Sequence, residues 1–226
     1  MKIRLFTIPN ILTLLNLLCG CIAAVLALHC DLQGAFWFII AAAALDFLDG
    51  FAARLLKAYS PIGKELDSLA DMISFGFTPS AILFNMYYTA GGVAPWGFAV
   101  FIVAAFSALR LAKFNIDERQ THGFIGMPTP ACAIFIASAG YLFSAGVYDI
   151  GPYAILVAAA VLSYLLVSNI PMFSLKFTRY GFKGNELRYT FLALSLVALS
   201  VWGVTAVPFI IAAYVAVSIA RRLAAK

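Results

Sequence analysis

The sequence predicts an all-α integral membrane protein, a polytopic bundle of about eight transmembrane helices that forms one domain over residues 1–226. Three observations support this fold class. The chain is 64% hydrophobic and only 11% charged, which is far from the composition of a soluble domain. Its apolar residues gather in stretches of about 20 residues, the length that an α-helix needs to cross a bilayer. Its basic residues are confined to alternate connections between those stretches.

The apolar stretches are expected to form the spans, with turns between them. In order, they cover residues 10–28, 34–56, 67–88, 95–115, 127–146, 151–169, 188–204 and 206–222. Glycine, proline and polar residues separate several of them, at 29–34, 89–95, 146–152 and around Gly203. The basic N-terminus resembles a signal peptide. The first stretch, however, is long, carries Asn16 and lacks a small-x-small cleavage site, so we expect a retained span.

The distribution of charge predicts the topology. All fifteen Lys and Arg residues lie in alternate connections or at the span ends that face them, whereas the opposite connections carry only Asp31 and Asp149. The positive-inside rule therefore places both termini in the cytoplasm, and the polar segment 46–71 on the same side. One long span over 189–220 would move the basic C-terminus to the other side, so we predict a hairpin near Gly203.

The net charge of +5 indicates contact with anionic membrane lipid. The basic residues are scattered among connections rather than gathered on one soluble face, and the sequence therefore predicts no nucleic-acid partner. Between residues 168 and 188, basic residues alternate with aromatic ones, a pattern typical of a segment that lies on anionic lipid; the alternative is a segment that contacts phosphate or other anionic groups of a substrate.

Four aspartates lie within or beside the second and third predicted spans, where a carboxylate costs about 2.5–3.5 kcal/mol on insertion scales. Asp46 and Asp49 are three residues apart and share one helix face, and Asp67 and Asp71, four apart, share another. A turn rich in proline and glycine at 59–63 joins the two helices. An antiparallel arrangement then brings both carboxylate pairs together near the membrane interface.

Carboxylate oxygens without nearby His or Cys favour Mg²⁺ or Mn²⁺, and a pair of such ions suits chemistry at phosphate groups. Ion pairing does not explain the cluster, because Arg54, Lys57 and Lys64 are too few to match the four aspartates and Glu65. A divalent-cation transporter is the alternative from a different class. Transporters distribute polar groups across the bilayer, whereas these are confined to one side, which favours an enzyme site that faces the cytoplasm.

The spacing of this segment resembles a known family signature. The pattern Asp46-x2-Asp49-Gly50-x2-Ala53-Arg54-x8-Gly63-x3-Asp67-x3-Asp71 matches the CDP-alcohol phosphotransferases at all eight fixed positions. Members of that family are polytopic helical enzymes that transfer a phosphatidyl-type group from a CDP-linked lipid to an alcohol and release CMP. The resemblance implies that the four aspartates bind metal ions, two in number, and that Asp71 is also the general base.

The same resemblance implies a nucleotide pocket formed by residues of the signature, namely Gly50, Ala53, Arg54, Gly63 and Asp67. It also implies a homodimer. No Ser, Cys or His occupies a fixed position of the signature, so a covalent enzyme intermediate is not expected.

Three further stretches, at residues 8–17, 107–115 and 124–130, resemble the phosphatidylserine synthase branch of this family, and the whole resemblance extends over about residues 8–188. It implies CDP-diacylglycerol and L-serine as substrates and phosphatidylserine and CMP as products. Glycerol phosphate, inositol or an amino alcohol is the alternative acceptor within the family.

The branch stretches contain further candidate site residues. Asn10 and Thr13, with Asn16 a turn later, present polar groups on one face near the start of the first span and are candidates to bind cytidine or phosphate; the alternative for Asn10 is to cap that helix. Arg110 and Lys113, with Asn115 beside them, lie at the end of the fourth span and are candidates to bind a serine carboxylate or a lipid phosphate. The alternative is that both basic side chains extend to anionic head groups.

Overall fold

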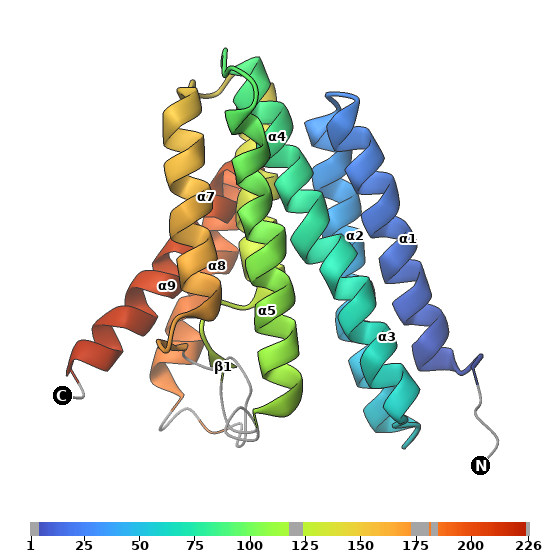
Figure 1. The fold of residues 1–226 in the computed structure, drawn as a ribbon. Helices are drawn as coiled ribbons and strands as arrows, with labels where there is room; N and C mark the ends of the chain where they lie inside the picture. The colour runs from blue at the N-terminus through green and yellow to red at the C-terminus, as the bar shows by residue number, and fades with distance from the viewer. Residues whose placement is uncertain (1–4, 118–123, 173–180, 182–184, 225–226) are drawn as a thin grey trace.

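The computed structural model describes residues 5–117, 124–172, 181 and 185–224, and in these residues the protein is a helical bundle with one short two-stranded ribbon (Figure 1). The first half contains α1 (Ile8–Leu28), α2 (Leu32–Leu55), α3 (Pro61–Asp71), the π-helical turn η1 (Met72–Phe77), α4 (Thr78–Thr89), the 3₁₀ turn η2 (Trp96–Phe101) and α5 (Ile102–Ile116). The second half contains β1 (Phe124–Ile125), α6 (Thr129–Ser144), α7 (Pro152–Val167), β2 (Pro171–Met172), α8 (Glu186–Trp202), η4 (Gly203–Thr205) and α9 (Ala206–Ala224).

In the described part of the chain these elements form eight helical segments, because α3, η1 and α4 form one continuous helix and η2 continues into α5. By length and composition, four apolar helical stretches are long enough to cross a membrane: 8–28, 32–55, 96–116 and 186–222. Helices α6 and α7 are apolar but shorter, at 16 residues each. The fold class predicted from the sequence, a helical membrane bundle, is confirmed.

The helix starts follow from local sequence. The Thr7 side chain accepts a hydrogen bond from the backbone of Asn10 and caps α1, with Pro9 in the first turn. The alternative in which Asn10 caps this helix is therefore wrong. Ser60 caps α3 by accepting from the Gly63 N–H. This cap starts the third helix at Pro61, six residues before the expected start of the span at 67.

The helical hairpin predicted at the C-terminus is present. Gly203 has φ of +55°, a conformation that interrupts the helix and that glycine adopts readily. The rings of Phe191 on α8 and Tyr214 on α9 are 6.2 Å apart, although one straight helix would separate them by about 35 Å. Figure 1 shows α9 returning toward the end of the bundle at which α1 begins.

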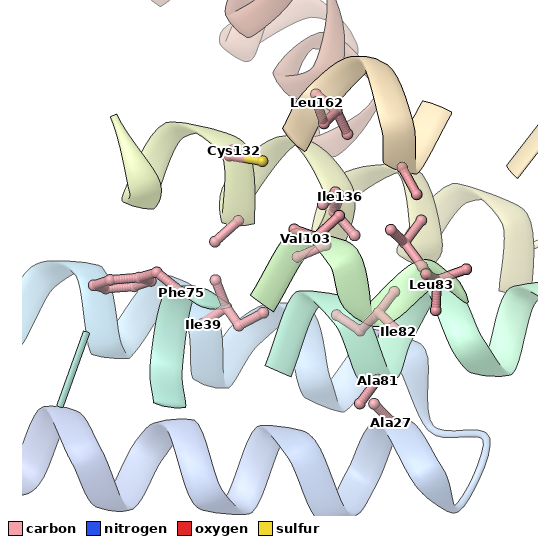
Figure 2. Close-up of a cluster of buried hydrophobic side chains, with 14 of the residues drawn as sticks. Ala27, Ile39, Phe75, Ala81, Ile82, Leu83, Val103, Cys132, Ile136 and Leu162 are labelled. Atoms are coloured by element: carbon pink, nitrogen blue, oxygen red, sulfur yellow. The ribbon is translucent and has the colours of Figure 1, made fainter. Parts of the chain in front are cut away.

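The interior of the bundle is apolar and well filled. Buried side chains from the central helices meet there, among them Ala27, Ile39, Phe75, Ile82, Val103, Ile136 and Leu162 (Figure 2). Helix α1 packs along α2 and along the α3–η1–α4 helix through small buried residues, Gly20, Ala23, Ala24 and Ala27. Small residues permit the close helix contact that stabilises bundles in lipid, where apolar burial alone provides little drive.

The β1–β2 ribbon joins the connections that follow α5 and α7, with Phe124 opposite Met172 and Ile125 opposite Pro171. Most of the basic, aromatic segment predicted to lie on lipid, including residues 173–180 and 182–184, lies outside the described residues.

Candidate active site

Three of the four aspartates meet between α2 and α3. One ligand atom from each of Asp46, Asp49 and Asp67 lies within 4.8 Å of the others. Asp49 is only 6% exposed, and the other two are partly buried. At this separation ionised carboxylates repel one another, and a cation bound between them would relieve that repulsion. The donor set, all carboxylate oxygen, fits a hard divalent cation such as Mg²⁺ or Mn²⁺.

The fourth carboxylate, Asp71, lies beside this group rather than in it. It is buried, follows Asp67 by one helical turn, and interacts electrostatically with Asp46 and Asp67. Asn16 of α1 donates from Nδ2 to its Oδ1 at 3.4 Å. Asp71 is therefore close enough to influence a bound cation. It belongs to α3, and its carboxylate accepts a hydrogen bond from α1.

Helix α1 also orients one of the three clustered aspartates. The Thr13 hydroxyl donates to Asp49 Oδ2 at 2.6 Å, and its other acceptor, the Pro9 carbonyl, is 3.0 Å away. The shorter bond, to a charged acceptor, is the stronger one. Asp67 Oδ1 is buried and has no hydrogen-bond partner among the described residues, so it is available to a ligand.

A cleft of about 480 Å³ opens beside the aspartates, between α1, α2, α3 and the α2–α3 connection. Its volume is within the usual range for small-molecule sites. Six of the seven residues predicted to bind nucleotide line it: Asn10, Thr13, Gly50, Ala53, Gly63 and Asp67. The seventh, Arg54, is exposed and is not part of the lining, although its Nη1 lies 3.8 Å from the position that a Cβ on Gly50 would occupy.

The two glycines of the cleft differ in their surroundings. A Cβ on Gly63 would lie 3.0 Å from Ser60 Oγ and 3.1 Å from Asn10 Oδ1, so this glycine lets α3 begin close to α1. A Cβ on Gly50 would meet only Arg54 within 4 Å. The space beside Gly50 therefore belongs to the cleft and is available to a ligand.

Arg110 of α5 lies near Asp71. Its side chain is only 5% exposed and interacts electrostatically with Asp71. Its Nε and Nη2, and the fully buried Oγ of Ser107 one turn earlier, have no hydrogen-bond partner among the described residues. Buried donors without partners are costly, so this combination marks the place of a polar ligand or of ordered water.

The two candidates that follow Arg110 in the sequence are engaged elsewhere. Lys113 Nζ donates to Asn169 Oδ1 at 3.1 Å, near the end of α7. Asn115 Nδ2 donates to Ser68 Oγ at 2.8 Å, and the Asn115 carbonyl accepts from Lys64 Nζ at 2.8 Å. These contacts tie α5 to α7 and α3, and only Arg110 of the three is brought to Asp71.

Asn16 was expected, with Asn10 and Thr13, to face the nucleotide, but its side chain contacts Asp71 instead and does not line the cleft. Ser107 was not among the residues predicted for the site. A lone serine in an apolar helix carries no comparable signal, since its hydroxyl usually bonds to a carbonyl of its own helix.

Comparison with known proteins places this geometry in context. Residues 6–169 match the sequence profile of the CDP-alcohol phosphatidyltransferase family. The chain is 34% identical over 164 residues to the CDP-diacylglycerol–serine O-phosphatidyltransferase of Bacillus subtilis, covering 72% of this chain and 88% of that protein. It is 34% identical over 198 residues to the protein of the same name from Helicobacter pylori, covering 85% and 83%. For that of Methanocaldococcus jannaschii the identity is 34% over 133 residues, covering 59% and 60%.

Proposed function

The chain belongs to the CDP-alcohol phosphatidyltransferase family and is an enzyme, and from this premise we propose that it transfers the phosphatidyl group of CDP-diacylglycerol to L-serine, forming phosphatidylserine and CMP. The observation that carries the proposal is the meeting of Asp46, Asp49 and Asp67 at the edge of a cleft lined by the family's signature residues. A nucleotide in that cleft would bring its diphosphate next to three carboxylates, an arrangement that requires cations between them.

Asp46, Asp49 and Asp67 would hold the metal, with Asp71 as a further ligand, and we propose two ions of Mg²⁺ or Mn²⁺. When bound, such ions neutralise the oxygens of the diphosphate and make CMP a better leaving group. Thr13 keeps Asp49 in its orientation through the 2.6 Å hydrogen bond. Gly50, Ala53 and Gly63 leave room for the nucleotide, with Asn10 and Arg54 at its margins.

In the proposed reaction, Asp71 accepts the proton of the serine hydroxyl as that oxygen forms a bond to the phosphorus on the lipid side. The bond from this phosphorus to the CMP oxygen breaks, and CMP leaves with the electron pair. Asn16, which donates to Asp71 Oδ1, leaves Oδ2 of the same carboxylate for the incoming hydroxyl. The lipid chains stay among the apolar helices while nucleotide and serine approach from water.

The unpaired buried groups near Asp71 support an amino acid as the acceptor. Arg110 and Ser107 offer donors for a carboxylate, and the buried Asn16 Oδ1, which has no partner among the described residues, offers an acceptor for an ammonium group. Inositol and glycerol phosphate have no ammonium group to match that acceptor, and an amino alcohol has no carboxylate to match the donors. L-serine matches both.

The test of the proposed function is CMP release from CDP-diacylglycerol by the purified protein with Mn²⁺ or Mg²⁺ and, in turn, L-serine, glycerol 3-phosphate, inositol and ethanolamine. We expect rapid release with L-serine only. Faster release with another acceptor would reassign the substrate within the family. Uptake of Mn²⁺ into proteoliposomes, without CMP release in the presence of any acceptor, would instead support a cation transporter.

We expect replacement of Arg110 by Lys or Ala to raise KM for serine with a smaller change in kcat. The guanidinium can bind a carboxylate with two hydrogen bonds, and an ammonium group or a methyl group cannot reproduce them. Loss of such positioning weakens binding of serine more than the chemical step. Initial rates at varied serine and saturating CDP-diacylglycerol measure the effect.

Two outcomes of the same assay contradict this role for Arg110. If Arg110→Ala keeps its KM for serine and loses affinity for CDP-diacylglycerol, Arg110 contacts a phosphate instead. If Lys113→Ala raises KM for serine and Arg110→Ala does not, the carboxylate partner is Lys113.

Gly50→Leu is expected to leave the fold intact and to lower activity about 10²-fold, because the new side chain would occupy the nucleotide cleft and displace the diphosphate. Binding of a CDP-diacylglycerol analogue and kcat/KM measure the loss. Ala44→Leu is the matched control, since Ala44 is exposed on the same helix. Normal nucleotide affinity in Gly50→Leu would move the nucleotide out of this cleft.

We further propose that the active site and both termini face the cytoplasm. The one-sided distribution of Lys and Arg supports this orientation. In a background without native cysteines, which removes the exposed Cys21 and Cys30, single cysteines at residues 33, 92, 149 and 203 should react with an impermeant reagent added outside. Those at 60, 120, 180 and 225 should not. Labelling at 225 from outside would contradict the proposed location of the C-terminus. A homodimer, also expected from the family, is tested by light scattering of the detergent-solubilised protein.

A further inference from the structure

Two side-chain hydrogen bonds join α1 to the helix that carries Asp71. Ser74 Oγ donates to the Asn16 carbonyl at 3.0 Å, and Thr78 Oγ1 donates to the Gly20 carbonyl at 2.9 Å. The two donors are four residues apart, as are the two acceptors, so the bonds are one turn apart along both helices. Both serine and threonine side chains are fully buried, and water does not compete for these bonds.

The helices touch at this point through backbone as well as side chains. A Cβ on Gly20 would lie 2.7 Å from the Ser74 Cα and closer still to its Oγ. No larger residue fits at position 20 without moving one helix away from the other. The spacing of α1 from the Asp71 helix is therefore set where Gly20 meets Ser74.

Ser74 lies in η1, the π-helical turn that begins directly after Asp71. Pro79, just beyond it, has no N–H to donate to the Phe75 carbonyl, and the wider turn accommodates this proline within a continuous helix. π-Helical turns inside α-helices are frequent at functional sites. Here the turn presents Ser74 to α1 on the same side as Asp71.

Asn16 is held at both ends by this one helix. Its backbone carbonyl accepts from Ser74, and its side-chain Nδ2 donates to Asp71 Oδ1. The second contact, at 3.4 Å, is near the upper limit of a hydrogen bond. A small slide of α1 along η1 would therefore break the contact between Asn16 and Asp71.

We propose that Ser74 is a positioning residue that acts through Asn16 to orient the Asp71 carboxylate toward the metal and the acceptor hydroxyl. The role of Asp71 in this statement rests on the proposed function, whereas the link from Ser74 to Asn16 to Asp71 rests on the contacts alone. Groups that hydrogen-bond to metal-binding side chains typically contribute 10–100-fold to metal affinity or activity.

Ser74→Ala tests the proposal, and Ser80→Ala is its matched control. Ser80 is also fully buried on the same helix, but its hydroxyl donates to the Gly76 carbonyl of that helix and does not reach α1. Thr78 is a poorer test, because its single hydroxyl hydrogen is shared between Gly20 and the Ile73 carbonyl. We expect Ser74→Ala to lower kcat and Mn²⁺ affinity about tenfold or more at unchanged KM for CDP-diacylglycerol, and Ser80→Ala to change neither.

Mn²⁺ affinity is measured by electron paramagnetic resonance on the detergent-solubilised protein, together with thermal unfolding of each variant. The double variant Asn16→Ala/Ser74→Ala decides how Ser74 acts. If Ser74 works through Asn16, the double variant loses no more Mn²⁺ affinity than Asn16→Ala alone, because the two residues form one chain of contacts. Purely additive losses, or equal losses in Ser74→Ala and Ser80→Ala, would overturn the proposal.

The Mn²⁺ titrations need neither lipid substrate nor serine. If the protein releases no CMP from CDP-diacylglycerol, the proposed function fails while the comparison of Ser74→Ala with Ser80→Ala still stands. If CMP release is normal and Ser74→Ala binds Mn²⁺ and turns over as the native protein does, only the positioning role fails.

Discussion

Asp71→Asn is expected to lower turnover by about 10²–10⁴-fold, the usual contribution of a general base, while CDP-diacylglycerol binds nearly as well as before. The substitution preserves the shape of the side chain and an oxygen that can accept from Asn16, but it removes the proton acceptor. Asp71 is buried beside the cluster of three carboxylates rather than within it. For this reason we expect Asp71→Asn to lower turnover while affinity for CDP-diacylglycerol changes little.

Single-turnover rates and equilibrium binding of a CDP-diacylglycerol analogue measure the two effects of Asp71→Asn. Asp31→Asn is a suitable control, because Asp31 is an exposed cap at the start of α2, at the opposite end of that helix from Asp49. Asparagine also caps helices well, so this control should keep full activity. Turnover near the native rate in Asp71→Asn would remove Asp71 from the mechanism. A loss of lipid-nucleotide affinity equal to that of Asp67→Asn would make it one more metal ligand.

Asp46→Asn, Asp49→Asn and Asp67→Asn are each expected to abolish metal binding and to lower turnover by about 10³-fold or more. A metal ion at a phosphoryl group supplies several kcal/mol of charge stabilisation, and each tenfold change in rate corresponds to about 1.4 kcal/mol. Because the ligand atoms of these aspartates lie within 4.8 Å of one another, loss of one carboxylate affects the coordination shared by all three.

Metal dependence can be measured without any substitution. EDTA should abolish CMP release by the native protein, and Mg²⁺ or Mn²⁺ should restore it. The three variants should insert into the membrane and unfold at temperatures near or above that of the metal-free native protein, since removing one carboxylate relieves repulsion within the cluster. Full activity in excess EDTA, or native Mn²⁺ affinity in Asp67→Asn, would contradict the metal site.

Several features of this protein could be predicted because they depend on residues close in the sequence. The apolar stretches identified most of the helical segments, and the charge pattern predicted the hairpin at Gly203, which the contact between Phe191 and Tyr214 confirms. Steps of three and four residues placed the aspartates on common helix faces, and three of them do meet. The cleft gathers six of the residues predicted to bind nucleotide because most of them are close neighbours along α1, α2 and α3.

The start of α3 was predicted less well, although its cause is local. The cap formed by Ser60 and the following Pro61 overrides the hydropathy pattern, which becomes apolar only after residue 66. Hydropathy reports where a helix enters lipid, whereas capping reports where the helix begins, and in this protein the two points differ.

The sequence by itself determined the helical segments and the shared faces of the aspartate pairs, because both follow from patterns over a few helical turns, and it carried the family signature in eight fixed residues. Only the tertiary structure decided which distant side chains reach the site. It brought Asn16 to Asp71 and Thr13 to Asp49, placed Arg110 by Asp71, and turned Lys113 and Asn115 toward other helices. These outcomes depend on how closely two helices approach and how each is rotated about its axis. A contact such as that of Gly20 with Ser74 determines both the distance and the rotation, but it leaves no periodic pattern in the sequence of either helix.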